Sequence, residues 1–152
     1  MNNAITLLKT DAIHPDFREL VKLLDAHLED KDGDKHPFFA QFNTLDAIKH
    51  AIVAYENDVA VGCGAIKAYS DAVMEVKRMY VKPEYRGQGI ASQVLASLEE
   101  WAKAMNYSET ILETLKAQTS VVAMYLRNGY EIIPNYGQYQ GVESSVCMNK
   151  KL

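Results

Sequence analysis

The spacing of hydrophobic residues changes partway along the chain, and this change separates predicted helices from predicted strands. Between Pro15 and Leu28 hydrophobic residues recur at helical spacing, which is typical of a helix packed on one face. Thr44 is suited to cap a second, short helix at 44–49. From residue 52 the helical spacing ends and short apolar, strand-like runs begin, and Glu56-Asn57-Asp58 predicts the tight turn of a hairpin. The strands predicted in this half are 4–8, 52–55, 59–68 and 73–81, the last three as an antiparallel meander.

The second half of the chain predicts helices that alternate with strands. Residues 89–105 form the clearest helical pattern, because Ile90, Val94 and Leu98 share one face and Glu99 points away from it. The other elements predicted here are strands at 111–114, 130–133 and 145–149 and a helix at 119–128. This order of elements predicts an α+β fold, in which a mixed sheet carries helices on both faces.

Composition limits the class of protein. The 152 residues, with a mass of 17.1 kDa, suffice for one domain, so we expect a single domain over residues 1–152. The 20 acidic residues outnumber the 16 basic ones and give a formal charge of −4, which argues against a general nucleic-acid-binding protein. No run reaches the ~18 apolar residues of a membrane span, and the first residues lack the pattern of a secretion signal. A soluble, cytoplasmic protein without a membrane partner is therefore expected.

Cysteine and histidine positions predict no metal site. Cys63 and Cys147 lie in apolar, strand-like runs, so both are expected to be reduced and buried thiols. The histidines are scattered, and no C-x-x-C pair or Cys/His cluster has the spacing of metal ligands.

One segment has the features of an anion-binding site. A predicted strand ends before Pro83, a loop with Gly87 and Gly89 follows, and the long helix begins directly after it. The first N–H groups of a helix lack internal partners and carry partial positive charge, and glycine lets the backbone curl around an anion. Arg86 adds a positively charged guanidinium, whose paired N–H groups are suited to bind phosphate. The segment predicts a pyrophosphate-binding loop, although an ordinary strand-to-helix turn fits the same pattern.

Two motifs at separate places in this half carry a resemblance. Arg86-Gly87-Gln88-Gly89-Ile90-Ala91 fits the pattern Gln/Arg-x-x-Gly-x-Gly/Ala. Downstream, Ala123-Met-Tyr125-Leu-Arg-Asn-Gly129-Tyr130 has a tyrosine followed, after three residues, by glycine and an aromatic residue. With the matching order of elements from Ile5 to Met148, the sequence resembles the GNAT superfamily of acetyl-CoA-dependent N-acetyltransferases.

The resemblance implies a fold and a cofactor site. It implies a mostly antiparallel mixed sheet of about seven strands, flanked by four helices, with splayed fourth and fifth strands. The pantetheine arm of acetyl-CoA would lie in that gap and pair with backbone groups of the fourth strand. The residues expected to bind acetyl-CoA are Met79, Val81, Arg86, Gly87, Gln88, Gly89, Ile90, Ala91, Ser92 and Ser120. Ser120 stands where many family members have Asn, and it can equally belong only to the first turn of its helix.

The resemblance also implies catalytic groups. Tyr125 matches the position of a general acid near the thioester sulfur, although a packed core tyrosine would fit the same pattern. Glu75 matches a glutamate that acts as base directly or through water, and by alternation it shares a face with Met79 and Val81. Glu113, on the next strand, is a rival for the base, and the sequence does not decide between them.

The expected activity is acetyl transfer from acetyl-CoA to a primary amine of a small molecule or peptide, by direct attack and without a metal. Residues 36–43, with three phenylalanines and a histidine, and the loop Tyr136-Gly-Gln-Tyr139 are expected to wall the acceptor pocket, unless they only pack. The alternatives are an acyl-CoA-binding regulatory module without turnover and an enzyme that uses a longer acyl donor. No nucleic-acid partner is expected, and a homodimer is compatible with the family.

Overall fold

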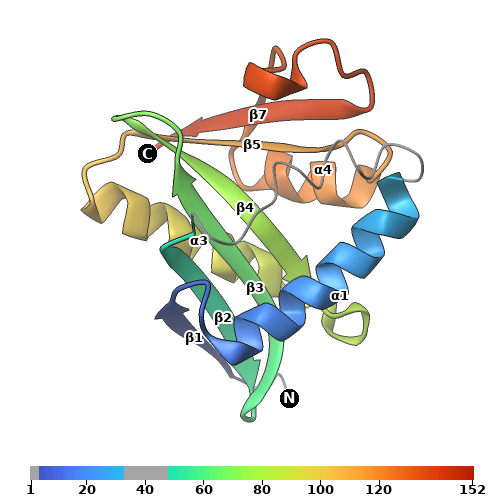
Figure 1. The fold of residues 1–152 in the computed structure, drawn as a ribbon. Helices are drawn as coiled ribbons and strands as arrows, with labels where there is room; N and C mark the ends of the chain where they lie inside the picture. The colour runs from blue at the N-terminus through green and yellow to red at the C-terminus, as the bar shows by residue number, and fades with distance from the viewer. Residues whose placement is uncertain (1–3, 33–47) are drawn as a thin grey trace. The chain divides into compact units, whose positions relative to one another are not determined.

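The computed structural model describes residues 4–32 and 48–152 and combines helices with the strands of a sheet (Figure 1). In chain order the elements are β1 (Ile5–Thr10), α1 (Pro15–Asp32), β2 (His50–Glu56), β3 (Val59–Ala68), β4 (Val73–Val81), the 3₁₀ turn η2 (Pro83–Tyr85), α3 (Ile90–Ala104), β5 (Glu109–Leu115), α4 (Thr119–Arg127), β6 (Glu131–Ile133), the 3₁₀ turn η3 (Gly137–Tyr139) and β7 (Ser145–Lys151). The strands pair in the order β1-β2-β3-β4-β5-β7-β6, with β4 and β5 parallel. The predicted α+β fold with a seven-stranded mixed sheet is confirmed.

The number of helices differs from the expected four. Within residues 4–32 and 48–152 there are three α-helices, namely α1, α3 and α4. Most of the helix predicted at 44–49 lies outside the described residues, whereas Ile48 and Lys49 have no regular secondary structure. Strand β2 already begins at His50, which pairs with Ile66 of β3. A helix at this position therefore cannot extend to His50, because that residue belongs to the sheet.

The chain divides into two compact units. One comprises Met1–Lys67 with Lys77–Leu98, and the other comprises Ala68–Val76 with Glu99–Leu152. Strand β4 and helix α3 each run from one unit into the other. The expectation that residues 1–152 fold as one domain stays a prediction.

In the first unit, the sheet has a helix on each face. Phe17 of α1 is fully buried in a core cluster with Cys63 of β3. Gly64 follows Cys63 in the strand and therefore faces the other way. A Cβ atom on Gly64 would lie 2.4 Å from Met79 Sδ and 2.9 Å from Val94 Cγ1 of α3. The glycine thus lets α3 approach the strand closely, which explains why a residue with low strand propensity occurs here.

Strand β4 is irregular at Arg78. This residue has a φ of 59°, a left-handed conformation that is uncommon for residues other than glycine. Its buried side chain points to α1, where Arg78 Nη1 lies 2.6 Å from Asp25 Oδ1. A left-handed residue inside a strand interrupts the alternation of side chains. The alternation that was used to place Glu75 on the face of Met79 and Val81 therefore does not extend across Arg78.

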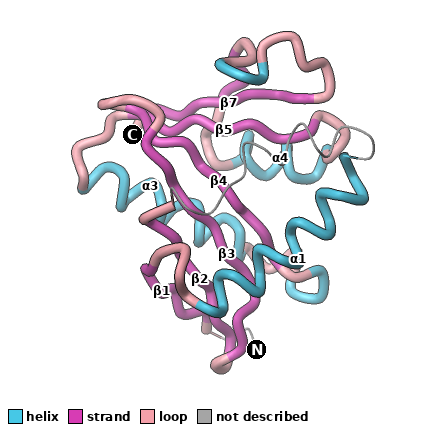
Figure 2. The backbone as a smooth tube through the Cα atoms, viewed as in Figure 1, coloured by secondary structure: helices cyan, strands magenta, loops and turns pink. Residues whose placement is uncertain are grey.

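In the second unit, β5, β7 and β6 form antiparallel ladders. Strand β5 pairs with β7 along its whole length, from Glu109 opposite Lys151 to Leu115 opposite Ser145. The parallel ladder between β4 and β5 is short, because it joins only Val73–Glu75 to Glu109–Ile111. Figure 2 shows that the chain leading into β7 is mostly loop, interrupted by a short helical turn.

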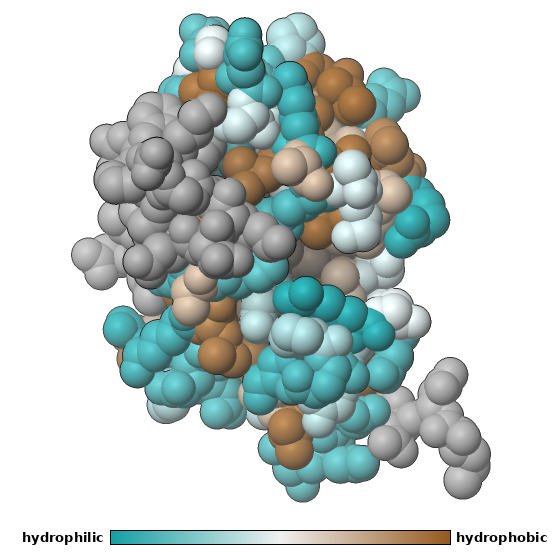
Figure 3. All heavy atoms as spheres, turned by 90° about the vertical axis from the view of Figure 1, so that its right-hand side faces the viewer, coloured by the Kyte–Doolittle hydropathy of each residue, from teal (hydrophilic) through white to brown (hydrophobic). Residues whose placement is uncertain are grey.

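Several large hydrophobic residues are exposed on the surface of the described part of the chain. Figure 3 shows one face, on which hydrophobic residues appear in separate groups between hydrophilic ones. The most exposed of the large hydrophobic residues are Ile13, at 75%, and Ile132, at 60%. Among the helices that the structure describes, none is both long and apolar enough to cross a lipid bilayer.

Candidate active site

The predicted pyrophosphate loop lies between η2 and α3 in the first unit. Arg86, Gly87, Gln88 and Gly89 are exposed, and Ile90 is buried as the first residue of α3. Gly87 has a φ of 78° and Gly89 a φ of 80°, so both adopt the left-handed conformation that glycine tolerates best. The two glycines turn the backbone out of the strand and into the helix within a few residues.

The start of α3 has the geometry of an anion site. The N–H of Gln93 bonds to the carbonyl of Gly89, so the helical ladder begins there and the N–H groups of the preceding turn are left for other partners. The first turn of α3, which the structure describes completely, contains no acidic residue. A Cβ atom added to Gly87 or Gly89 would meet nothing within 4 Å. The loop therefore offers open space, backbone donors and a helix dipole, a combination that fits the diphosphate of a nucleotide cofactor.

Arg86 is anchored beside this loop. Its Nε donates a hydrogen bond of 2.8 Å to the carbonyl oxygen of Val81, and its guanidinium lies 5.6 Å from the centre of the Tyr80 ring. These two contacts fix the plane of the guanidinium and leave its terminal N–H groups as further donors. The carbonyl of Val81, expected to meet the cofactor arm, already accepts this bond and retains a second lone pair.

In the second unit, two of the carboxylates lie among hydroxyl groups and a thiol. We call Glu75, Glu113, Tyr136, Tyr139 and Cys147 the carboxylate cluster, because both glutamates act electrostatically on Tyr139 and Cys147. Each carboxylate has a hydroxyl donor. Tyr136 Oη donates to Glu75 Oε2 at 2.5 Å, and Ser145 Oγ donates to Glu113 Oε2 at 2.5 Å. The structure thus brings the two predicted candidates for the base into one cluster.

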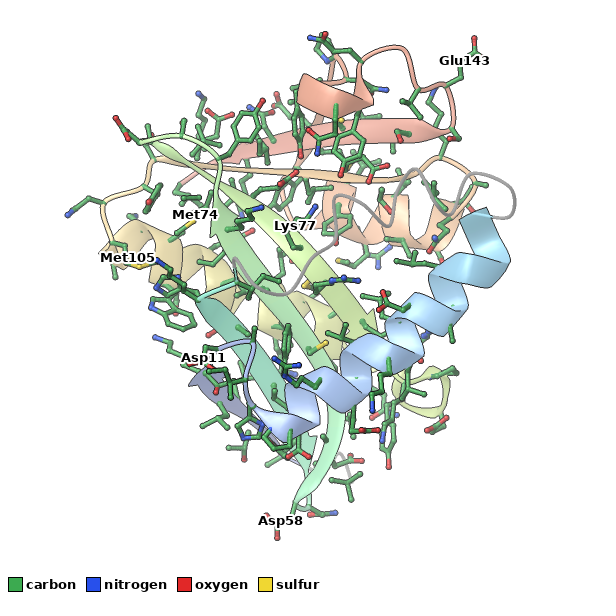
Figure 4. All side chains as sticks on the ribbon, viewed as in Figure 1. Asp11, Asp58, Met74, Lys77, Met105 and Glu143 are labelled. Atoms are coloured by element: carbon green, nitrogen blue, oxygen red, sulfur yellow. The ribbon has the colours of Figure 1, made fainter. Side chains whose placement is uncertain are left out.

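The two carboxylates differ in exposure. Glu75 is buried, with 7% of its surface exposed, whereas Glu113 is half-buried. Glu143, another acidic residue of this part of the chain, is exposed and points away from the protein (Figure 4). The loop between β6 and β7 therefore contributes tyrosines, and no further carboxylate, to the cluster.

Tyr125 of α4 is buried and lies near Glu113 of the carboxylate cluster. Its ring meets that of Tyr130 edge to face, with centroids 5.7 Å apart. Burial, and to a smaller extent the charge of Glu113, raises the pKa of Tyr125. Its hydroxyl donates no hydrogen bond to any residue that the structure describes. A phenol that keeps its proton is suited to give it to a leaving group.

Other predicted site residues have less distinctive surroundings. Ser120 is exposed in the first turn of α4, and no side-chain cap is present at that helix start. Ser92 and Ala91 are half-buried in the first turn of α3. The predicted acceptor wall at 36–43 lies outside the described residues. In the ranges 4–32 and 48–152, no three His, Cys, Asp or Glu side chains gather as metal ligands.

Asn135 organises the loop between β6 and β7, and sequence reasoning missed it. Its Nδ2 donates to the carbonyls of Tyr139, Val142 and Ser145, at 3.1, 3.0 and 3.3 Å. One amide group thus ties the start of the loop to its middle and its end. The sequence offers a weak indication, since asparagine next to proline favours a turn, but it names none of the three acceptors.

The comparisons with known proteins agree with this geometry. A family model described as the acetyltransferase (GNAT) family matches residues 12–130. An IAA acetyltransferase from Azospirillum brasilense is 30% identical over 156 residues, which cover 97% of this chain and 98% of that protein. A provisionally assigned acyl-CoA N-acyltransferase from Klebsiella pneumoniae subsp. pneumoniae has a TM-score of 0.82 and 32% identity, covering 99% of each chain. An acetyltransferase of the GNAT family from Elizabethkingia anophelis, solved with acetyl-CoA bound, has a similar fold, with a TM-score of 0.74, 19% identity and coverage of 99% of this chain and 100% of that one.

Proposed function

The chain belongs to the GNAT family of acetyltransferases, and from this premise we propose that it moves an acetyl group from acetyl-CoA to a primary amine of a small molecule or peptide. Acetyl-CoA supplies an acetyl group that its thioester activates. Donor and acceptor are held together, so that the amine attacks directly and no acetylated form of the protein arises.

The loop before α3 carries this proposal. Gly87 and Gly89 leave open space where a side chain would stand, and the start of α3 provides backbone donors and no acidic side chain. A diphosphate fits this site by charge and by shape, and Arg86 adds N–H groups at its border. The short ladder between β4 and β5 supports a cofactor arm that pairs with the backbone of β4 beyond Glu75, near Met79 and Val81.

The carboxylate cluster and Tyr125 supply the proton transfers. An ammonium group has no lone pair, so a base must first take a proton from the amine. We assign this role to Glu75, which is buried and held by Tyr136. Tyr125 gives its proton to the departing sulfur, since its raised pKa keeps it protonated at neutral pH. As the tetrahedral intermediate collapses, the nitrogen gives up its second proton to water, and water returns a proton to Tyr125. Glu75 then releases the proton it took from the ammonium to solvent, so that one proton is released overall for each acetyl group transferred.

A screen of amine acceptors tests the proposed function. We expect the purified protein to release free thiol from acetyl-CoA in the presence of some members of a panel of small amines, amino acids and peptides. A reaction without amine serves as the control, because it reports hydrolysis and any signal from Cys63 and Cys147, both buried thiols. Binding of acetyl-CoA with no thiol release for any acceptor would contradict the proposal and favour a regulatory binding module. Comparison with longer acyl donors would show whether acetyl is preferred.

Replacing Tyr125 tests its proposed role as the general acid. Tyr125→Phe keeps the ring and its contact with Tyr130, and it removes only the hydroxyl. We expect kcat to fall about 10- to 100-fold while the Kd for CoA stays unchanged, because a general acid acts on the leaving group and not on binding. In the wild type, the pKa of Tyr125 lies above its ordinary value of 10.0, so its deprotonation causes no loss of activity below that pH. Full turnover in the variant would show that another group protonates the sulfur.

A further inference from the structure

The hydroxyl of Tyr136 makes a short contact with the carboxylate assigned as base. Tyr136 lies between β6 and β7, 61 residues from Glu75, and its Oη is 2.5 Å from Glu75 Oε2. Glu75 is 7% exposed, so water has little access to its oxygens. Inside a protein, a hydrogen bond to a carboxylate decides both where the carboxylate points and how readily it ionises.

The ring of Tyr136 is held on two sides. It meets Tyr69 edge to face, with centroids 5.2 Å apart, and Tyr139 edge to face at 5.7 Å. The preceding residue, Asn135, closes the loop through its three hydrogen bonds to backbone carbonyls. The position of the hydroxyl is therefore set by packed rings and a closed loop, and not by a freely rotating side chain.

The groups around Glu75 make Tyr136 a donor. Burial, followed by the charge of Glu75, raises the pKa of Tyr136 above its ordinary value of 10.0, so the phenol keeps its proton. Burial also raises the pKa of Tyr139 and of Cys147 on β7, which keeps both groups neutral. Among the described residues of this unit, Glu113 on β5 is a further charged group that acts on Tyr139 and Cys147, and it has its own donor in Ser145.

We propose that Tyr136 is a positioning residue for the reaction: its hydroxyl holds the Glu75 carboxylate in one orientation, ready to take the proton of the incoming amine. This inference rests on the proposed function, in which Glu75 is the base. In the proton transfer, the amine loses a proton to Glu75, and Glu75 passes it to solvent. Tyr136 keeps its own proton throughout.

The pH dependence of Tyr136→Phe tests this role. The variant keeps the ring and its two edge contacts, and it removes the hydrogen bond. Because a donated hydrogen bond favours the ionised carboxylate, its loss should move the acidic limb of the pH profile of kcat/KM upward by about one pH unit. We expect kcat on the plateau to fall less than about tenfold and the KM for acetyl-CoA to stay unchanged, since the base itself is retained. A variant that was merely less stable would not move the limb.

Tyr69→Phe is the matched control. It also removes one hydroxyl from the aromatic group, but Tyr69 contacts Tyr136 through its ring and makes no side-chain hydrogen bond to any described residue. We expect the acidic limb of this variant to coincide with that of the wild type. A limb that moved equally in both variants would overturn the role of Tyr136.

A second measurement separates this inference from the proposed function. The carboxyl carbon of Glu75, labelled with ¹³C and assigned through its absence in Glu75→Gln, can be titrated by NMR without any acceptor. We expect its titration midpoint to rise in Tyr136→Phe and not in Tyr69→Phe. An unchanged midpoint would overturn the role of Tyr136 and leave the proposed function intact. A raised midpoint with an unmoved kinetic limb would overturn Glu75 as the base, and with it the positioning role.

Discussion

Glu75→Gln is expected to lower kcat by about 10²- to 10⁴-fold, the usual contribution of a general base. Glutamine has the same shape and can still accept a hydrogen bond from Tyr136, so the packing around it should persist. The Kd for CoA should remain unchanged, because the diphosphate loop lies in a different segment of the chain. Thiol release measured across pH, with a good acceptor, checks these expectations.

Glu113→Gln is the matched comparison for this prediction. Glu113 lies in the same carboxylate cluster and accepts a hydrogen bond from Ser145 at the same distance, 2.5 Å, as Glu75 does from Tyr136. Loss of a nearby charge without loss of the base should reduce kcat less than about tenfold. A larger loss in Glu113→Gln than in Glu75→Gln would instead assign the base to Glu113. Small and equal losses would assign the proton transfer to water.

Gly89→Val is expected to raise the Kd for CoA at least about tenfold. At a φ of 80° a β-branched side chain is strained, and shifting the backbone away from this conformation turns the N–H groups of the loop away from the diphosphate. The added side chain would also enter the open space next to the loop. Strain of about 1–2 kcal/mol corresponds to roughly a tenfold change in affinity if it falls on the binding conformation. Calorimetric titration with CoA measures this directly.

Gly141→Val controls for backbone strain. Gly141 has a φ of 77°, and an added Cβ there would also meet nothing within 4 Å, but it lies in the loop between β6 and β7. The two substitutions should lower the free energy of unfolding by similar amounts. Only Gly89→Val should weaken the binding of CoA. Equal CoA affinity in the two variants would leave the loop before α3 without its proposed role.

Local patterns were sufficient to predict much of the fold. Strands β3 and β4 have the predicted bounds, because the turn at Glu56-Asn57-Asp58 precedes β3 and Pro83 follows the end of β4. The glycine loop was also predictable, since a strand, two glycines and an amphipathic helix are neighbours in the sequence. Features that depend on a few consecutive residues can be inferred in this way.

Features that depend on distant partners could not be inferred. Glu99 was predicted to point away from the core, but its side chain is only 11% exposed, and Lys150 Nζ lies 2.9 Å from its Oε1. Helical periodicity identifies the apolar face and says nothing of a cation supplied from β7. The pairing of Tyr136 with Glu75 was missed for the same reason, because the sequence marked the loop as tyrosine-rich without naming what the tyrosines contact.

The three hydrogen bonds of Asn135 have a consequence for how relatives of this chain can diverge. Because the amide grips backbone carbonyls, the closure of the loop does not depend on which side chains stand at the intervening positions, such as the exposed Gln140. Substitutions at these exposed positions can change the chemical character of the loop surface, while the hydrogen bonds that close the loop persist. We therefore expect relatives of this chain to differ at these surface positions while the hydrogen bonds that close the loop are kept.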